Sequence, residues 1–144
     1  MFGGIYEKKL IILIFIICII LIGLAIIFKN KGNTSNVRII SKKSQIYSKD
    51  DIDSAIAVTK KYFKENFYKC SLLKIGYIGD ARNNEYLDKA SYYNKEQVIV
   101  LISDFYVSPT GGDGSLNQDF QYENWMWILV RNKNENWEHV DHGY

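Results

Sequence analysis

Hydrophobic residues follow three patterns along the chain: an unbroken run near the N-terminus, a helical spacing after position 48, and alternation in the second half. The unbroken run, residues 10–28, contains no charged side chain. Apolar residues at every second position are typical of half-buried strands, and a spacing of three to four residues is typical of a helix with one apolar face. The chain is therefore predicted to carry one membrane-length helix followed by an α+β domain.

The apolar run is long enough to cross a bilayer. As a helix, its 19 residues would extend about 28 Å, close to the thickness of the hydrocarbon core. A cleaved signal peptide is the main alternative, because Lys8 and Lys9 precede the run. However, cutting after Ala25 would leave Ile26 near a new terminus, and Cys18 lacks the small neighbour that a lipoprotein signal needs. We expect an uncleaved single-pass anchor.

Flanking charges and overall architecture favour opposite orientations of this anchor. The positive-inside rule compares two lysines before the run with five basic residues after it, which would place the domain in the cytoplasm. The abundance of Ile, Lys, Asn and Tyr, which have AT-rich codons, indicates a low-GC bacterium. In bacteria, a short basic tail before a long C-terminal domain is the usual architecture of secretory anchors. We expect residues 1–9 to be cytoplasmic, residues 10–28 to span the cell membrane and residues 46–144 to be extracytoplasmic.

Residues 29–45 are basic and polar, and they are predicted to form a linker. They hold five positive charges and no acid, whereas residues 46–144 contain 11 Lys and Arg against 15 Asp and Glu, a net charge of −4. Solvated surface charge is the simpler interpretation, and a tether lying along an anionic surface is the alternative. The membrane is the partner that the sequence predicts directly; neither nucleic acid nor a cofactor is expected.

A helix is predicted to begin at Ser48. Ser48 and Asp51 fit a variant of the capping box, and three acidic residues lie near the positive end of the helix dipole. The apolar positions that follow recur every three to four residues, so this helix should lie on a sheet. They are Ile52, Ala55, Ile56, Tyr62, Phe63 and Phe67.

Alternating apolar residues then predict strands. These cover residues 70–79, residues 97–107 and the two arms of a hairpin within residues 122–144. In the first strand, Leu73, Ile75 and Tyr77 should share one face. Residues 80–95 give a mixed signal, within which residues 85–93 fit a short helix or irregular structure. The order predicts an α+β fold, with a helix packed on a curved, cone-like antiparallel sheet of about four strands.

The inward face of the hairpin depends on its register, since a slip of one residue exchanges the two faces. With a five-residue loop (132–136), one face carries Trp125, Trp127, Leu129, Arg131, Trp137, His139 and Asp141. With a four-residue loop, His139 and Asp141 join the opposite, apolar face. We prefer the five-residue loop, which makes the tryptophan face the functional one and leaves His142 opposite.

Residues 108–121 form the longest predicted loop. Asp113, Ser115, Asn117 and Asp119 recur at every second position, as in a calcium-binding loop. The residues at the sixth and twelfth positions are not the Gly and Glu that such a loop needs. A flexible rim loop with Asx turns is favoured, and no metal site is predicted.

Five stretches of the domain resemble one family. They are YSKDDI at 47–52, VIVLISDF at 98–105, GGDGSLN at 111–117, YENWMWILVR at 122–131 and HVDHGY at 139–144. The family consists of small, uncharacterised domains from low-GC Gram-positive bacteria, within the nuclear transport factor 2-like or cystatin-like group of cone-shaped folds. The resemblance covers residues 47–144 and implies the fold. It implies no function, because the family is a domain of unknown function.

Two classes of function remain. The first, which we favour, is a non-catalytic module at the cell surface that binds a small ligand, a peptide or a protein. The second is a small enzyme in which Asp104, His139 and Asp141 act as acid and base groups. No nucleophile, metal cluster or phosphate-binding loop in the sequence supports catalysis. The residues predicted to bind a ligand are Trp125, Trp127, Trp137, His139 and Asp141.

Overall fold

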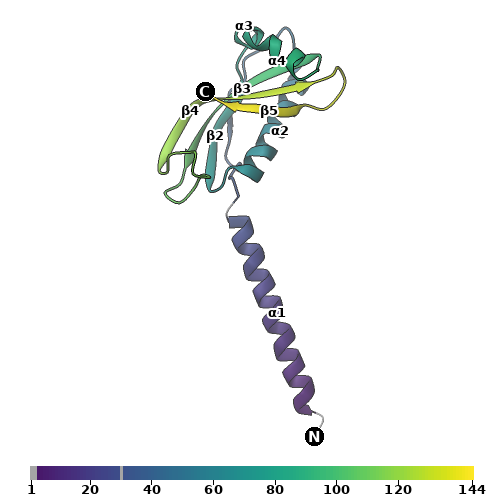
Figure 1. Cartoon of the computed structure of the whole chain (residues 1–144), viewed down its shortest axis with the longest axis vertical. Coiled ribbons are helices and arrows are strands. Elements are labelled where there is room, and N and C mark those ends of the chain that lie inside the picture. The colour runs from purple at the N-terminus through teal and green to yellow at the C-terminus, as the bar shows by residue number, and fades with distance from the viewer. Residues whose placement is uncertain (1–2, 30) are drawn as a thin grey trace. The chain divides into compact units, whose positions relative to one another are not determined.

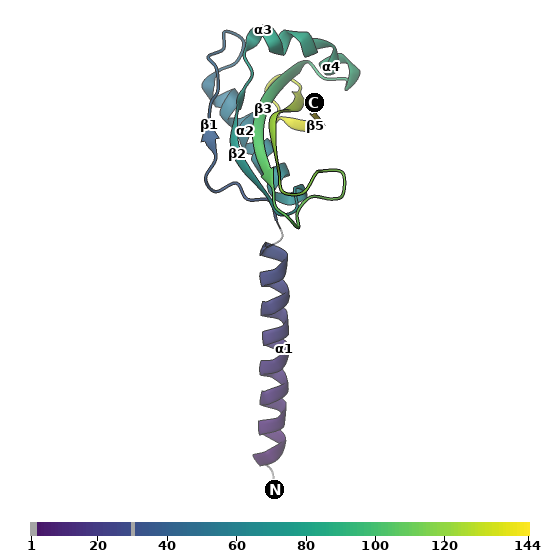
Figure 2. The same cartoon turned by 90° about the vertical axis from the view of Figure 1, so that its left-hand side faces the viewer.

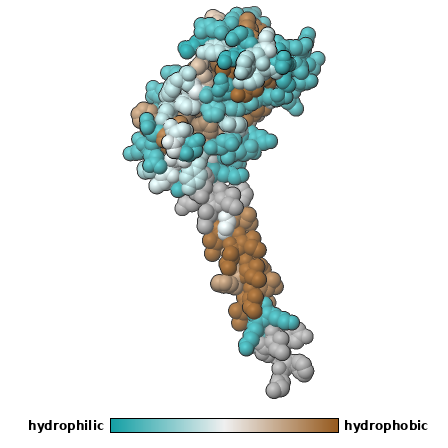
Figure 3. Space-filling model, viewed as in Figure 1, coloured by the Kyte–Doolittle hydropathy of each residue, from teal (hydrophilic) through white to brown (hydrophobic). Residues whose placement is uncertain are grey.

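The computed structural model describes residues 3–29 and 31–144, and it divides into two units, Met1–Lys31 and Gly32–Tyr144. The first unit contains helix α1 (Gly3–Lys29), whose segment Glu7–Ala25 is apolar and long enough to cross a membrane. The side chains of this segment face outward, and none of the segment is buried (Figure 3). An apolar N-terminal helix of this kind is consistent with a membrane anchor and with a signal sequence.

The second unit is an α+β structure built on one open sheet (Figure 1). The strand order is β1-β2-β3-β4-β5; β1 runs parallel to β2, and the other neighbouring pairs are antiparallel. The strands are β1 (Arg38–Ile39), β2 (Cys70–Tyr77), β3 (Gln97–Val107), β4 (Phe120–Arg131) and β5 (Glu138–Gly143). The helices are α2 (Lys49–Asn66), α3 (Asp80–Asn83), η1 (Asn84–Tyr86) and α4 (Leu87–Tyr92). The α+β prediction is confirmed, with five strands where about four were expected.

Helix α2 begins where the sequence predicts. The Ser48 hydroxyl accepts a hydrogen bond from the Asp51 N–H (3.1 Å), and the Asp51 carboxylate accepts one from the Ser48 N–H (3.1 Å), which completes the capping box. The predicted apolar stripe packs on the sheet. Its aromatic contacts join Phe63 and Phe67 of the α2 segment to Phe105 of β3 and Trp127 of β4.

Most of the segment predicted as a linker lies against the sheet. Residues 38–39 form β1, the Ile40 N–H donates to the Ile75 carbonyl (3.0 Å), and the Gly32 N–H donates to the Lys64 carbonyl (3.0 Å). A Cβ at Gly76 would come within 2.6 Å of the backbone nitrogen of Ser41, so this close approach requires glycine. The sheet unit therefore begins at Gly32. Only two of these residues form a regular strand, which is too few for an alternating pattern.

A β-bulge changes the predicted face of β2. The pairing between β2 and β3 shifts at Leu73, which is not paired with any residue of β3. The Leu73 side chain is 39% exposed, whereas Ile75 and Tyr77 are buried. The prediction that all three residues share one face is therefore wrong for Leu73. A bulge of this kind depends on pairing with a distant strand, and the sequence of β2 alone does not reveal it.

Residues 80–92 form three short helices at one end of β3 and β4, opposite the loop that joins these strands (Figure 2). Strand β2 ends at Tyr77, and the buried Asn83 side chain continues its hydrogen bonding to β3. The Asn83 amide donates to the Val98 carbonyl (3.2 Å) and accepts from the Val100 N–H (2.8 Å). This side chain satisfies backbone groups that β2 no longer reaches.

Candidate functional site

The β4–β5 hairpin combines the predicted register with a bulge. Next to the turn, Leu129 pairs with His139, as the five-residue loop requires. One position further, the register shifts, so that Trp127 pairs with His142. His142 thus joins His139 and Trp127 on the face covered by α2, and Asp141 turns to the opposite face. The predictions that Asp141 shares this face and that His142 lies opposite are wrong for this reason.

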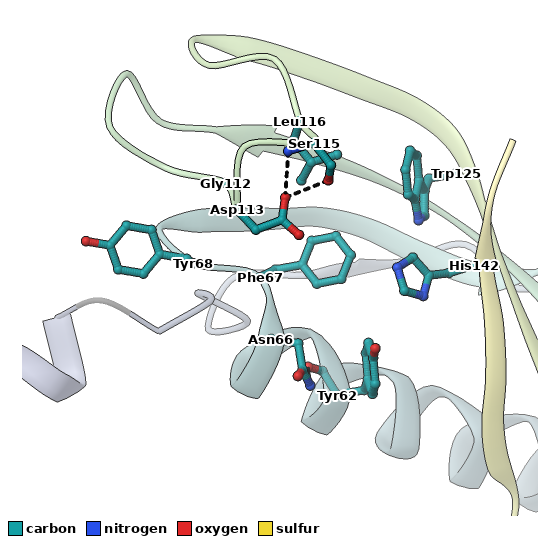
Figure 4. A pocket seen from close by; sticks show the side chains of 10 residues that line it. All are labelled: Tyr62, Asn66, Phe67, Tyr68, Gly112, Asp113, Ser115, Leu116, Trp125 and His142. Carbon is teal, nitrogen blue, oxygen red and sulfur yellow. Dashed lines mark hydrogen bonds between the residues drawn. The ribbon is translucent and has the colours of Figure 1, made fainter.

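A cavity of about 370 Å³ opens between α2, the β3–β4 loop and the hairpin (Figure 4). Its wall is strongly aromatic and contains few charges. Tyr62 and Asn66 come from α2, Phe67 and Tyr68 from the turn that follows, Asp113 and Ser115 from the loop, and Trp125 and His142 from the hairpin. Pockets with aromatic walls and a few polar groups are typical sites for small organic ligands.

His142, which lines the cavity, forms a pair with His139. Nδ1 of His142 lies 3.2 Å from Nε2 of His139, and the His139 ring lies against the Tyr62 ring at a centroid distance of 3.9 Å, with the ring planes tilted by 34°. Burial, helped by the neighbouring His142, lowers the pKa of His139 to about 4, although Asp141 acts in the opposite direction. Burial also lowers the pKa of His142. Both rings are therefore mainly neutral at pH 7, and one nitrogen of the pair donates to the other.

Trp125 lines the cavity and carries an unpaired donor. Its Nε1 is buried and has no hydrogen-bond partner among the described residues. The other two indoles are satisfied: Trp127 donates to the Ser103 hydroxyl (2.7 Å), and Trp137 donates to the Asp51 carbonyl (3.0 Å). Figure 4 shows the nitrogen edge of Trp125 turned toward His142. A ligand atom that accepts a hydrogen bond could satisfy this group.

Asp113 supplies the negative charge of the cavity wall. Its carboxylate accepts two hydrogen bonds from Ser115, one from the backbone N–H (2.9 Å) and one from the hydroxyl (2.5 Å), so the loop contains the predicted Asx turn. The hydrogen bonds from Ser115 lower the pKa of Asp113, and His142 has a smaller effect in the same direction. Asp113 is therefore ionised at neutral pH.

Two of the predicted ligand-binding residues belong to the core. Trp127 is fully buried beneath α2, and Trp137 is 3% exposed with the Arg131 guanidinium 4.0 Å from its ring centre. Arg131 also forms an ion pair with Asp51 (2.6 Å), and Trp137 donates to the carbonyl of the same residue. Together these two side chains hold the start of α2 on the hairpin. Neither tryptophan lines the cavity, whereas Trp125 does and His139 lies directly behind His142.

The three residues considered as acid and base groups do not form one site. Asp104 forms an ion pair with Lys74 (2.6 Å) and accepts from the Asn124 N–H (2.9 Å), which fixes the irregular turn of β4 at that residue. No hydrogen bond joins Asp104 to His139 within the part of the chain that the structure describes. Asp141 is exposed, and among the described residues its carboxylate accepts a hydrogen bond from the His142 N–H (2.9 Å). This arrangement does not favour the enzyme hypothesis.

Sequence reasoning missed much of the cavity wall. The sequence predicts Tyr62 and Phe67 only as core positions, and Asp113 as a turn residue or a candidate calcium ligand, although each lines the cavity. The sequence also predicts His142 on the other face. The one available signal is the spacing of His139 and His142, which brings both rings to one face only if the strand is bulged. Among the described residues, no group of three His, Cys, Asp or Glu side chains is placed to hold a metal ion.

Comparisons with protein-family models, with curated proteins and with solved structures gave no match to this chain.

Proposed function

We propose that this chain is a membrane-anchored binding domain without catalytic activity, which takes a small organic ligand into the cavity beside Trp125 and His142. Helix α1 serves as the anchor, residues 1–9 face the cytoplasm, and the sheet unit lies outside the cell membrane. The apolar surface of α1 supports the anchor, because its outward side chains need an apolar environment.

The free indole N–H of Trp125 is the observation that carries the proposal. A buried donor without an acceptor costs roughly 1–3 kcal/mol, and native proteins rarely leave one unpaired. A ligand oxygen or nitrogen at this position removes that cost. Nε2 of His142 provides a second polar contact, because Nδ1 is engaged by His139. The rings of Tyr62 and Phe67 supply flat apolar surface on which the rest of a ligand packs.

Thermal unfolding of the full chain in detergent micelles tests this function. Small cationic, neutral and anionic fragments are added one at a time, and a fragment that occupies the cavity raises Tm by mass action. The variant Trp125→Phe keeps an aromatic ring but removes the N–H, so the rise in Tm should shrink. Asp88→Asn, on the exposed surface of α4, is the control and should leave it unchanged. The proposal is wrong if no fragment raises Tm, or if Trp125→Phe responds like the wild type.

A further inference from the structure

Among the described residues, the cavity wall carries one formal charge, on the exposed side chain of Asp113. Asp113 is the only carboxylate among the lining residues, and neither Lys nor Arg lines the cavity in the described chain. The two hydrogen bonds from Ser115 reach the same oxygen of Asp113, Oδ1. No hydrogen bond from another described residue reaches Oδ2, and Figure 4 shows the second carboxylate oxygen on the side of Phe67. An anionic ligand would be repelled here, whereas a cation would be attracted.

The ring faces act in the same direction. The faces of Trp, Tyr and Phe rings carry negative electrostatic potential and attract ammonium groups, and aromatic walls of this kind hold ammonium ligands in other proteins. Tyr62, Phe67 and Trp125 all contribute rings to the cavity. An ammonium group of the chain itself already uses such a ring nearby, since Nζ of Lys69 lies 5.1 Å from the centre of the Tyr68 ring.

The two polar contacts of the cavity lie apart. In Figure 4, Asp113 and Trp125 stand on opposite sides of the Phe67 ring. A ligand lying between them has the Asp113 carboxylate at one end and the Trp125 indole, whose buried N–H has no partner among the described residues, at the other. The complementary ligand has positive charge at one end and a hydrogen-bond acceptor at the other.

We infer that the ligand is a small ammonium cation that also carries an oxygen acceptor. The ammonium group contacts Asp113 and the ring faces, and the oxygen accepts from Nε1 of Trp125. This inference rests on the proposed binding function and specifies the ligand class for the same cavity. It separates Asp113, which recognises charge, from Trp125, which recognises the acceptor.

Three probes of almost identical shape test the role of charge. They are choline, its neutral analogue in which carbon replaces the quaternary nitrogen, and the carboxylate made by oxidising the hydroxyl of that analogue. Binding to the full chain is measured by calorimetry in a non-ionic detergent, which has no choline headgroup to compete. Choline should bind at least about tenfold more tightly than the neutral analogue, and the carboxylate should bind most weakly.

Two matched variants separate local charge from net charge. Asp113→Asn should weaken choline binding by about tenfold and leave the affinity for the neutral analogue unchanged. Asp88→Asn changes the net charge by the same amount and should leave both affinities unchanged. Equal binding of choline and its neutral analogue overturns the inference, as does unchanged choline affinity in Asp113→Asn. If neutral or anionic fragments still raise Tm through Trp125, the cavity remains a binding site and only the ligand class is wrong. If no probe or fragment binds, the proposed function fails as well.

Discussion

Trp125, Trp127 and Trp137 occupy three different environments within one hairpin. Trp127 is sealed beneath α2, Trp137 holds the start of that helix, and Trp125 borders the cavity with a free N–H. Their amino-acid type and alternation predict a buried face, but the partner of each indole comes from a distant part of the chain. A sequence pattern therefore identifies these residues as important without distinguishing core from ligand contact.

The histidine pair makes stability depend on pH. The folded pKa of His139 is about 4, below its ordinary value of 6.5, so the unfolded state binds more protons between these values. The free energy of unfolding should decrease as pH falls from 6.5 toward 4. His139→Gln should reduce this slope, and Asp88→Asn should not. Urea midpoints of the full chain at pH 7 and pH 5 measure the effect; a slope that His139→Gln leaves intact would assign the titration to other groups.

At the scale of elements, local chemistry predicts most of the fold. Strand β3 has the bounds expected from its apolar run, and α2 follows the capping box formed by Ser48 and Asp51. The errors share one cause, which is pairing between distant segments. The bulge in β5 exchanges Asp141 for His142, β1 exists only because residues 38–39 meet β2, and Asn83 acts where β2 stops. The cavity wall combines residues of α2, the β3–β4 loop and the hairpin, which are distant in the sequence. The sequence therefore predicts only part of the candidate site.

Gly76 offers a test of how β1 is held. The substitution Gly76→Ala places a Cβ against the backbone of Ser41 and should push the β1 segment away from β2. Amide hydrogen exchange at Ile40 and Lys42, which donate to carbonyls of β2, should accelerate by at least about tenfold, while β3 and β4 stay protected. Leu73→Ala, at the exposed bulge, is the control. Unchanged exchange at Ile40 would show that this close approach does not hold the segment.

At the scale of the whole molecule, an apolar helix and a sheet unit with its own core are joined in one chain. Among the residues that the structure describes, all core residues lie within the sheet unit, so α1 adds nothing to this core. With the proposed orientation, a reporter that is active only outside the membrane should work when fused after Tyr144, and protease added to intact protoplasts should remove the domain. Protection from protease, with activity of a cytoplasmic reporter, would reverse the orientation.

The indole N–H signals of the three tryptophans provide the most direct test of the binding cavity. In a nitrogen–proton NMR spectrum of the full chain in micelles, Trp127 and Trp137 should show hydrogen-bonded signals, and Trp125, assigned by Trp125→Phe, should differ from both. Addition of choline should shift the Trp125 signal in a saturable manner while the signals of Trp127 and Trp137 stay in place. A Trp125 signal that no probe or fragment moves, or that already has the position of a hydrogen-bonded indole, would contradict the account.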